Sequence, residues 1–154
     1  MIDNIHKNFI EYTLKLAEEA KKIDEVPIGA IIVRDSQIIA EAYNLREKNQ
    51  SVTGHAEILA IEKAAKKLNS WRLSDCTLYV SLEPCLMCAG ALIQSRIQSV
   101  YFGAFDPKGG ALGSLYQLHE DKRLNHRFTV IGGICQKDCG AILSEYFKSK
   151  RQTL

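Results

Sequence analysis

The chain has 154 residues, of which 46% are hydrophobic and 25% are charged. This composition is that of a compact globular protein and excludes a disordered or fibrous chain. The length fits one domain over residues 1–154 with a substantial core. The formal net charge is only +2, so any nucleic acid would have to be bound by basic residues concentrated locally.

The start of the chain and its cysteines predict where the protein works. Residues 1–4 lack a basic start before an apolar run, and no stretch is long enough to span a bilayer. Five cysteines, an odd number, do not form a disulfide framework and suit a reducing compartment. We therefore expect a cytoplasmic protein without a membrane partner.

The apolar pattern predicts helices and strands that alternate along the chain. A first helix, capped by Asp3, has an apolar face formed by Ile5, Phe9, Tyr12, Leu16 and Ala20. Strands are expected at residues 28–33, 37–43, 77–81, 99–104 and 128–132, with a polar turn at residues 34–36. Further helices begin near His55 and Pro84, and a closing helix includes residues 142–147. This order predicts a three-layer α/β/α sandwich around a central mixed five-stranded sheet.

A histidine, a glutamate and two cysteines indicate a catalytic metal site. The pattern is His-Ala-Glu at residues 55–57, followed by Pro-Cys-x-x-Cys at residues 84–88. His55, Cys85 and Cys88 offer one imidazole and two thiolates, which leave the fourth corner of a tetrahedral zinc ion open for water. Glu57 suits proton transfer beside the metal rather than coordination. This signature is typical of zinc nucleobase deaminases.

The spacing of these residues predicts that two helices begin at one ion. Cys85 and Cys88 are separated by three positions, so both sulfurs project from the first turn of a helix that Pro84 opens. The positive end of the helix dipole favours thiolates there. The alternative is a structural zinc site closed by another histidine or cysteine, which does not explain the glutamate at position 57.

Six further segments extend this pattern along most of the chain. They are VPIGA at residues 26–30, AYN at 42–44, LYVSLEP at 78–84, FGAFDPK at 102–108, NHR at 125–127 and FKSKR at 147–151. Together with the zinc motif they resemble the bacterial tRNA-specific adenosine deaminase family of the cytidine deaminase superfamily. Gly109 and Gly110 depart from the family pattern and predict a flexible loop on the substrate side.

The resemblance implies a reaction and a set of contacts. The reaction is hydrolytic deamination of adenosine to inosine at the wobble position of a tRNA anticodon stem-loop, with one Zn²⁺ in each subunit of a homodimer. Glu57 would be the catalytic residue. Substrate contacts are implied at Asn44, Ala56, Asp106, Asn125, Arg127, Phe147, Lys148 and Arg151.

Some of these residues also have ordinary structural explanations. Asn44 could read a purine edge, and Asp106 could accept a hydrogen bond from a ribose 2′-hydroxyl. Both are equally typical of turns. The cations of residues 148–151 follow two aromatic rings and could hold RNA, or they could form a solvated helix end.

The remaining cysteines and histidines have no clear chemical partner in the sequence. Cys135 and Cys139 are four positions apart and could form a second metal pair. Unsupported thiols are more often small buried side chains, and this is the expectation for them and for Cys76. The same expectation applies to His6, His119 and His126.

Two other functions remain compatible with the sequence. A deaminase of free guanine, cytosine or a nucleoside would use the same zinc chemistry, because the shape of the pocket decides the base. The basic and aromatic end of the chain argues against it. A zinc-stabilised RNA-binding module without turnover is the second alternative, and Glu57 argues against that one.

Overall fold

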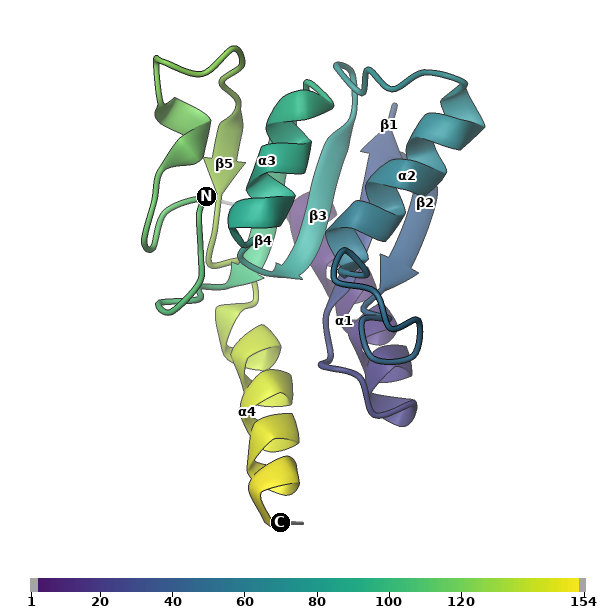
Figure 1. The fold of residues 1–154 in the computed structure, drawn as a ribbon, viewed down its shortest axis with the longest axis vertical. Helices are drawn as coiled ribbons and strands as arrows, with labels where there is room; N and C mark the ends of the chain where they lie inside the picture. Colours follow the sequence, from purple (N-terminus) through teal and green to yellow (C-terminus); the bar gives the residue numbers. More distant parts are fainter. Residues whose placement is uncertain (1–2, 153–154) are drawn as a thin grey trace.

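A computed structural model describes residues 3–152, which form one five-stranded sheet with helices on its faces (Figure 1). The strands are β1 (Gly29–Arg34), β2 (Gln37–Tyr43), β3 (Thr77–Leu82), β4 (Ser99–Ala104) and β5 (Thr129–Ile131). The helices are α1 (Asn4–Lys22), α2 (Ala56–Leu68), α3 (Leu86–Gln94), the short 3-10 helix η1 (Leu118–Glu120) and α4 (Gln136–Gln152). No helix within this part of the chain is both long and apolar enough to cross a membrane.

The sheet is mixed, as the sequence predicts. Its strand order is β2-β1-β3-β4-β5. β1 pairs antiparallel with both β2 and β3, whereas β3, β4 and β5 are parallel. The parallel pairs require crossover connections, which α3 and the segment through η1 provide.

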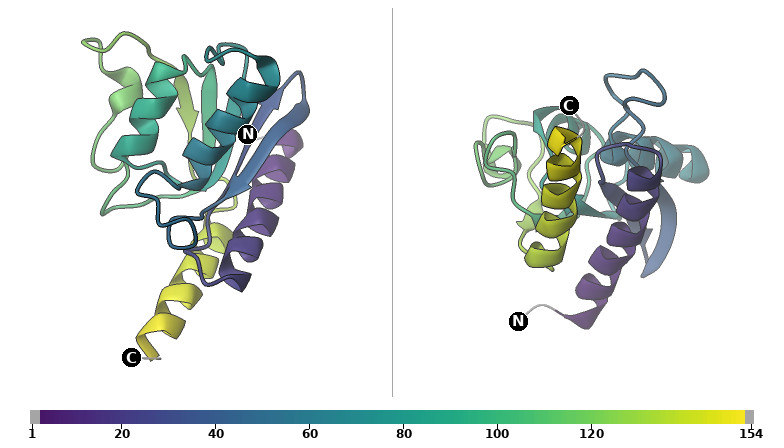
Figure 2. Two further views of the ribbon diagram at one scale, coloured as in Figure 1. Left: turned by 45° about the vertical axis from the view of Figure 1, so that its right-hand side comes forward. Right: turned by 90° about the horizontal axis from the view of Figure 1, so that it is seen from below.

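Helices cover both faces of the sheet and confirm the three-layer architecture (Figure 2). Neighbouring residues of β1 point to opposite faces, so Ile32 and Ile31 belong to different cores. The core around Ile32 includes Ala60 of α2 and Leu92 of α3. The core around Ile31 includes residues of α1 and α4, namely Ile10 and Cys139.

The topology brings several strand ends to one edge of the sheet. Since β1 is antiparallel to its two neighbours, β2, β3 and β4 all run in the same direction and end at the same edge. Helices α2 and α3 begin at this edge, and α4 extends beyond it (Figure 1). The edge therefore gathers the residues that follow three strands and open two helices.

Two details of the helix starts differ from the predictions. Helix α3 begins at Leu86 rather than at Pro84, because Cys85 forms an isolated bridge with Gly110 and the Ala111 amide donates to the Pro84 carbonyl (2.9 Å). This strand-like pairing keeps Cys85 extended, at the cap position of the helix. Asp3 precedes α1 as expected, but its side chain makes no capping hydrogen bond.

Candidate active site

The two helix starts bring His55, Cys85 and Cys88 together. His55 precedes the first residue of α2, Cys85 precedes the first residue of α3, and Cys88 lies in the first turn of α3. The Nδ1 atom of His55 is 3.6 Å from the Cys85 sulfur and 3.5 Å from the Cys88 sulfur. These side chains form one group of possible metal ligands, and no other His, Cys, Asp or Glu between residues 3 and 152 belongs to it.

The geometry of this group fits a tetrahedral metal ion. Zinc–sulfur bonds of about 2.3 Å and zinc–nitrogen bonds of about 2.05 Å place tetrahedral sulfur and nitrogen ligands about 3.6 Å apart. Both observed sulfur–nitrogen distances agree with that value. A tetrahedral ion held by these three side chains would have a fourth position left for solvent or substrate, as in a catalytic rather than a structural site.

The ionisation of the three ligands also favours a cation between them. Hydrogen bonds from Cys88 and His55 lower the pKa of Cys85 to about 4. The pKa of Cys88 is raised, first by its hydrogen bond to Cys85 and then by burial. The hydrogen bond to Cys85 raises the pKa of His55 as well. Each of these shifts arises from contact among the three side chains, and a metal ion bound between them would displace the protons that they carry.

Glu57 lies beside the ligands, in the first turn of α2. Its side chain is only 4% exposed. Burial raises the pKa of Glu57 to about 7, while the positive charge of His55 and a hydrogen bond from Cys88 act in the opposite direction. A carboxyl group with a pKa near neutrality can both accept and donate a proton. Glu57 is therefore a buried acid–base group next to the metal ligands.

These residues open onto a cavity of about 690 Å³. His55, Glu57 and Cys85 form part of its wall. The remaining wall comes from the segment before β1, the ends of β2, β3 and β4, and the exposed side of α4. Its size is that of a typical small-molecule or nucleotide site.

Asn44 faces this cavity and also supports its wall. The Asn44 side-chain amide donates to the Val26 carbonyl (3.3 Å), and its oxygen accepts from the Arg46 amide (3.2 Å). Asn44 is 4% exposed. The turn explanation is thus correct, and the same side chain still lines the cavity.

Asp106 is likewise a turn residue at the edge of the cavity. Its Oδ1 atom accepts hydrogen bonds from the Lys108 and Gly109 amides, both at 3.1 Å. Its own amide donates to Glu83 (3.0 Å). The loop that was expected to be flexible thus contains a turn whose backbone amides donate to the Asp106 and Glu83 carboxylates.

Two of the predicted contact residues on α4 line the cavity, and the rest of its basic end lies elsewhere. Phe147 and Arg151 line the cavity, whereas Lys148 is exposed outside it. Lys150 instead donates to Asp24 at 2.8 Å, so this cation ties α4 to the segment after α1. The cations at the end of α4 therefore have different surroundings: the cavity for Arg151, solvent for Lys148 and Asp24 for Lys150.

Three other predicted contact residues do not face the cavity. Ala56 is fully buried. Asn125 and Arg127 are exposed on the loop before β5, at the edge of the sheet opposite the metal ligands. Arg127 donates to the carbonyls of Lys122 and Leu124 within that loop.

Several cavity residues were not predicted from the sequence. Arg46, Phe105 and Lys108 contribute two cations and an exposed aromatic ring to its wall. Glu25 and Glu83 are buried at 1% and 2% exposure and accept hydrogen bonds from the backbone of the two loops that flank the cavity. Basic residues in loops gave a weak signal. Glu83 lies in the segment 78–84 that resembles the family, but the resemblance implied no role for it, and nothing in the sequence distinguished Glu25 from a surface carboxylate.

The remaining cysteines and histidines have structural surroundings. Cys139 is buried, and burial raises its pKa to about 12. Cys135 and Cys139 belong to no group of three possible ligands among residues 3–152. His126 contacts the Ile97 carbonyl (2.7 Å), and His6 contacts the Tyr79 hydroxyl (2.7 Å). The expectation of a buried thiol therefore fits Cys76 and Cys139, whereas Cys135 is half-buried.

Comparison with known proteins gives a consistent set of relatives. Residues 4–151 match the model of the MafB19-like deaminase family. The chain is 48% identical to the tRNA-specific adenosine deaminase of Bacillus subtilis (strain 168), over 94% of this chain and 89% of that protein.

Solved structures share the fold. A structure from a study of A-to-I editing by tRNA:A34 deaminases at the wobble position is 41% identical, with a TM-score of 0.85 over 88% of this chain and 99% of that one. The guanine deaminase of Nitrosomonas europaea is more distant, at 30% identity and a TM-score of 0.76 over 91% of this chain and 83% of that one.

Proposed function

The chain belongs to the tRNA-specific adenosine deaminase family, and we propose that it hydrolyses the wobble adenosine of a tRNA anticodon to inosine and ammonia. The observation that carries this proposal is the group of His55, Cys85 and Cys88 beside the buried Glu57, all next to one open cavity. A ligand set with an open position and an adjacent acid–base group is the arrangement that hydrolytic deamination requires.

We propose that the metal is zinc, one ion per chain. One nitrogen and two sulfur ligands at tetrahedral separation suit zinc better than calcium or magnesium, which prefer oxygen. Zinc supplies a nucleophile at neutral pH because it lowers the pKa of a bound water towards about 7. His55, Cys85 and Cys88 would hold the ion and fix its position relative to Glu57.

Glu57 moves the protons in this scheme. Its carboxylate accepts a proton from the attacking water and delivers it to N1 of the adenine ring while the oxygen adds at C6. It then carries the second proton of that water to the amino group, which leaves as ammonia. The burial of Glu57 suits this role, because it holds the carboxyl group beside the proposed ion and away from bulk solvent.

Asn44 orients the base. The two backbone hydrogen bonds of its amide use one N–H and one lone pair, so one N–H and one lone pair remain for a substrate. Because those bonds also fix the side chain, it can hold a purine edge without losing much rotamer freedom.

The surroundings of the cavity favour RNA over a free base. Arg46, Lys108 and Arg151 place three cations around it, where they can contact phosphates. Phe105 and Phe147 are 44% and 43% exposed, so each offers a ring for stacking of an unpaired base. Asp106 remains available to a neighbouring ribose through its carboxylate.

The competing function is deamination of free guanine. The structural similarity to the Nitrosomonas europaea guanine deaminase favours it as the second candidate. The two functions share their metal chemistry and differ in the substrate beyond the reacting base.

A substrate comparison tests the proposal. Purified protein is incubated with a tRNA whose anticodon begins with adenosine, and inosine is located by sequencing the RNA. Free adenosine and free guanine are assayed in parallel by release of ammonia. We expect inosine at the wobble position and little ammonia from either small molecule. Efficient release of ammonia from guanine, with unmodified tRNA, would establish the competing function instead.

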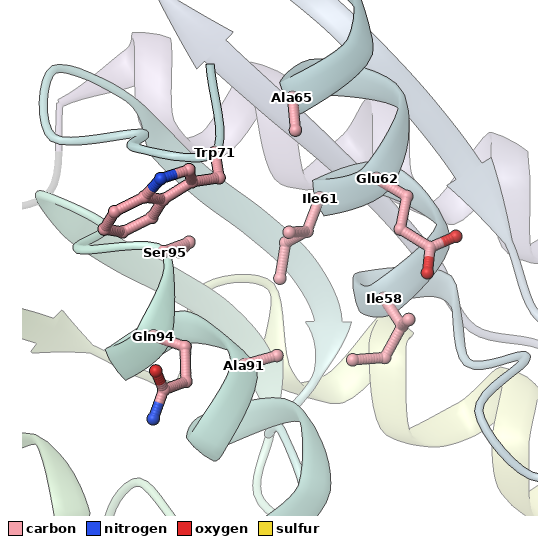
Figure 3. A pocket seen from close by; sticks show the side chains of 8 residues that line it. All are labelled: Ile58, Ile61, Glu62, Ala65, Trp71, Ala91, Gln94 and Ser95. Atoms are coloured by element: carbon pink, nitrogen blue, oxygen red, sulfur yellow. The ribbon is translucent and has the colours of Figure 1, made fainter.

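We further propose that the protein is a homodimer and that the groove between α2 and α3 is its interface. This groove has a volume of about 560 Å³ (Figure 3). Its wall is largely apolar and includes Ile58, Ile61 and Ala91, together with Trp71, which is 59% exposed. An apolar surface with an exposed tryptophan is typical of a protein interface. A second copy of the chain is the occupant that the family resemblance implies.

A homodimer would also give a role to contact residues that lie far from their own cavity. Asn125 and Arg127 are exposed at the opposite edge of the sheet. In a homodimer, the loop of one subunit can help to build the substrate surface of the other. Lys148 can reach RNA from outside the cavity, whereas buried Ala56 can do so only through its backbone.

We place the reaction in the cytoplasm and assign it to one domain. The resemblance to tRNA-modifying enzymes supports the location. The match of one family over residues 4–151 supports the single domain.

A further inference from the structure

Glu83 is a buried carboxylate surrounded by hydrogen-bond donors from a single loop. Its Oε1 atom accepts from the Asp106 amide at 3.0 Å and from the Ser114 hydroxyl. Its Oε2 atom accepts from the Leu112 amide at 3.2 Å and from the Ser114 amide at 2.9 Å. Glu83 is 2% exposed, and none of the ion pairs recorded for residues 3–152 includes it. Its charge is therefore compensated by the dipoles of these donors.

The loop is shaped around this carboxylate. A Cβ atom added to Gly110 would lie 2.2 Å from the Glu83 carboxylate, so a side chain at this position has no room. The Gly110 amide donates to the Asp106 carbonyl (2.8 Å), and the Ala111 amide donates to the Pro84 carbonyl (2.9 Å). Residues 105–114 therefore wrap around Glu83 and also contact the backbone next to the metal ligands.

Only a carboxylate satisfies all the donors. Each oxygen of Glu83 receives two hydrogen bonds. A glutamine has one acceptor oxygen and one NH₂ group, so it would direct donor hydrogens at two of the loop donors. A buried donor without an acceptor destabilises the folded loop. The loop would therefore shift until water can accept hydrogen bonds from these donors.

The anchored loop connects the metal ligands with the substrate side of the cavity. Glu83 lies two residues before Cys85 in the chain, and Asp106, whose amide it fixes, lies on the cavity wall with Phe105 and Lys108. Movement of the loop would displace these wall residues relative to the metal site. A substrate is held productively only if both sets of contacts keep their separation.

We propose that Glu83 is a positioning residue: its carboxylate sets the distance between the metal-ligand segment and the wall formed by residues 105–108. This inference rests on the proposed function, because the wall matters only if it binds the substrate. It assigns Glu83 no contact with substrate and no role in proton transfer. Its removal should weaken substrate binding more than the chemical step.

Glu83→Gln tests the proposal with three measurements on the full chain. Hydrogen exchange of residues 105–115 should accelerate by at least about 10-fold, while exchange in β3 and β4 stays as in wild type. Zinc content should be unchanged. The kcat/KM on an anticodon stem-loop should fall by about 10-fold or more, mainly through a higher KM. Ser114→Ala, which removes only the hydroxyl donor, should show smaller changes in the same direction and serves if Glu83→Gln does not fold.

A pair of glycine variants provides the matched control. Gly110→Ala pushes a methyl group into the carboxylate and should reproduce the exchange pattern of Glu83→Gln. Gly109→Ala lies in the same loop, and its added carbon meets the Asp106 carboxylate at 3.1 Å rather than Glu83. In the Gly109→Ala variant, the amides of Leu112 and Ser114 should exchange at the wild-type rate.

Two results would overturn the proposal. Unchanged loop exchange together with an unchanged KM in Glu83→Gln would mean that the carboxylate positions nothing. Loss of zinc, or faster exchange throughout the chain, would make Glu83 a general support of the fold. If wild-type protein modified no RNA, the proposed function would fail, and the exchange pattern would still decide whether Glu83 anchors the loop.

Discussion

The Cys88 sulfur lies 3.5 Å from the Nδ1 atom of His55, although the two residues are 33 positions apart in the chain. Helices α2 and α3 pack on the same face of the sheet and begin at the same edge, and this arrangement creates the contact. The distance matches that between two ligands of one tetrahedral zinc ion. The group of possible metal ligands is thus a consequence of how the two helices start.

Removal of a ligand should release the metal. Cys85→Ala is expected to lose stoichiometric zinc and to lower the melting temperature, because the ion would join the starts of α2 and α3. Elemental analysis and thermal unfolding measure both effects. Cys135→Ala, at a half-buried thiol outside the ligand group, should keep its zinc. Equal zinc content in the two variants would exclude the proposed ligand set.

Glu57→Gln should separate metal binding from catalysis. The amide has nearly the same shape as the carboxyl group but cannot accept and return a proton. We expect normal zinc content and a fall in kcat of at least about 100-fold. Glu120→Gln, at an exposed carboxylate, should have normal turnover. Near-normal kcat in Glu57→Gln would assign the proton transfer to another group.

Asn44→Ala should impair catalysis more than RNA binding. It removes the side chain that we propose holds the base edge, together with two hydrogen bonds that support the cavity wall. A loss of roughly 1 to 3 kcal/mol for unpaired polar groups corresponds to a fall of about 5- to 150-fold in kcat/KM. Single-turnover kinetics and filter binding on the same variant distinguish the two effects. A variant with full activity would leave Asn44 as a turn residue alone.

The basic residues of α4 should contribute unequally to RNA binding. Arg151 lines the cavity, whereas Lys150 forms an ion pair with Asp24. Arg151→Ala should therefore lower the slope of log affinity against log salt by about 0.7 to 0.9, the value for one lost phosphate contact. Lys150→Ala should change this slope less. RNA affinity measured at several salt concentrations gives the slope for each variant. Equal slopes for wild type and Arg151→Ala would mean that Arg151 contacts no phosphate.

Disruption of the α2–α3 groove should change the oligomeric state. Trp71→Glu adds a charge to an exposed apolar side chain in the groove, so it should convert a dimer into a monomer with little effect on folding. Sedimentation at several concentrations measures this. Val52→Glu, at a 78% exposed residue outside the groove, is the matched control and should remain dimeric. A wild-type monomer, or a dimeric Trp71→Glu, would exclude the groove as the interface.

The sequence predicts the ligands and the architecture because both depend on local patterns. Short runs rich in β-branched and aromatic residues predict the strands, and the spacing of Cys85 and Cys88 within one helical turn predicts the group of possible ligands. The predicted start of α3 is wrong by two residues, because Cys85 pairs with Gly110, which is distant in sequence. Local pattern contains no information about that pairing.

The supports of the cavity could not be predicted for the same reason. Glu25 and Glu83 accept hydrogen bonds from residues 22 to 31 positions later in the chain. Whether a glutamate is exposed or buried against such a loop is decided only when the sheet brings the segments together. The basic end of α4 shows the same limit, because the partner of Lys150 is Asp24, near the other end of the chain.

The most direct test of the central claim is the ratio of kcat/KM for an anticodon stem-loop to that for free adenosine. Under the proposed function, the group of His55, Cys85 and Cys88 acts with Glu57 on either substrate, whereas most of the cations and rings around the cavity would contact only the RNA. Those remote contacts should orient the base at the reacting centre and so raise kcat/KM for the RNA. We predict a ratio of at least about 1,000, with inosine formed only at the wobble position. A ratio near one would contradict the account.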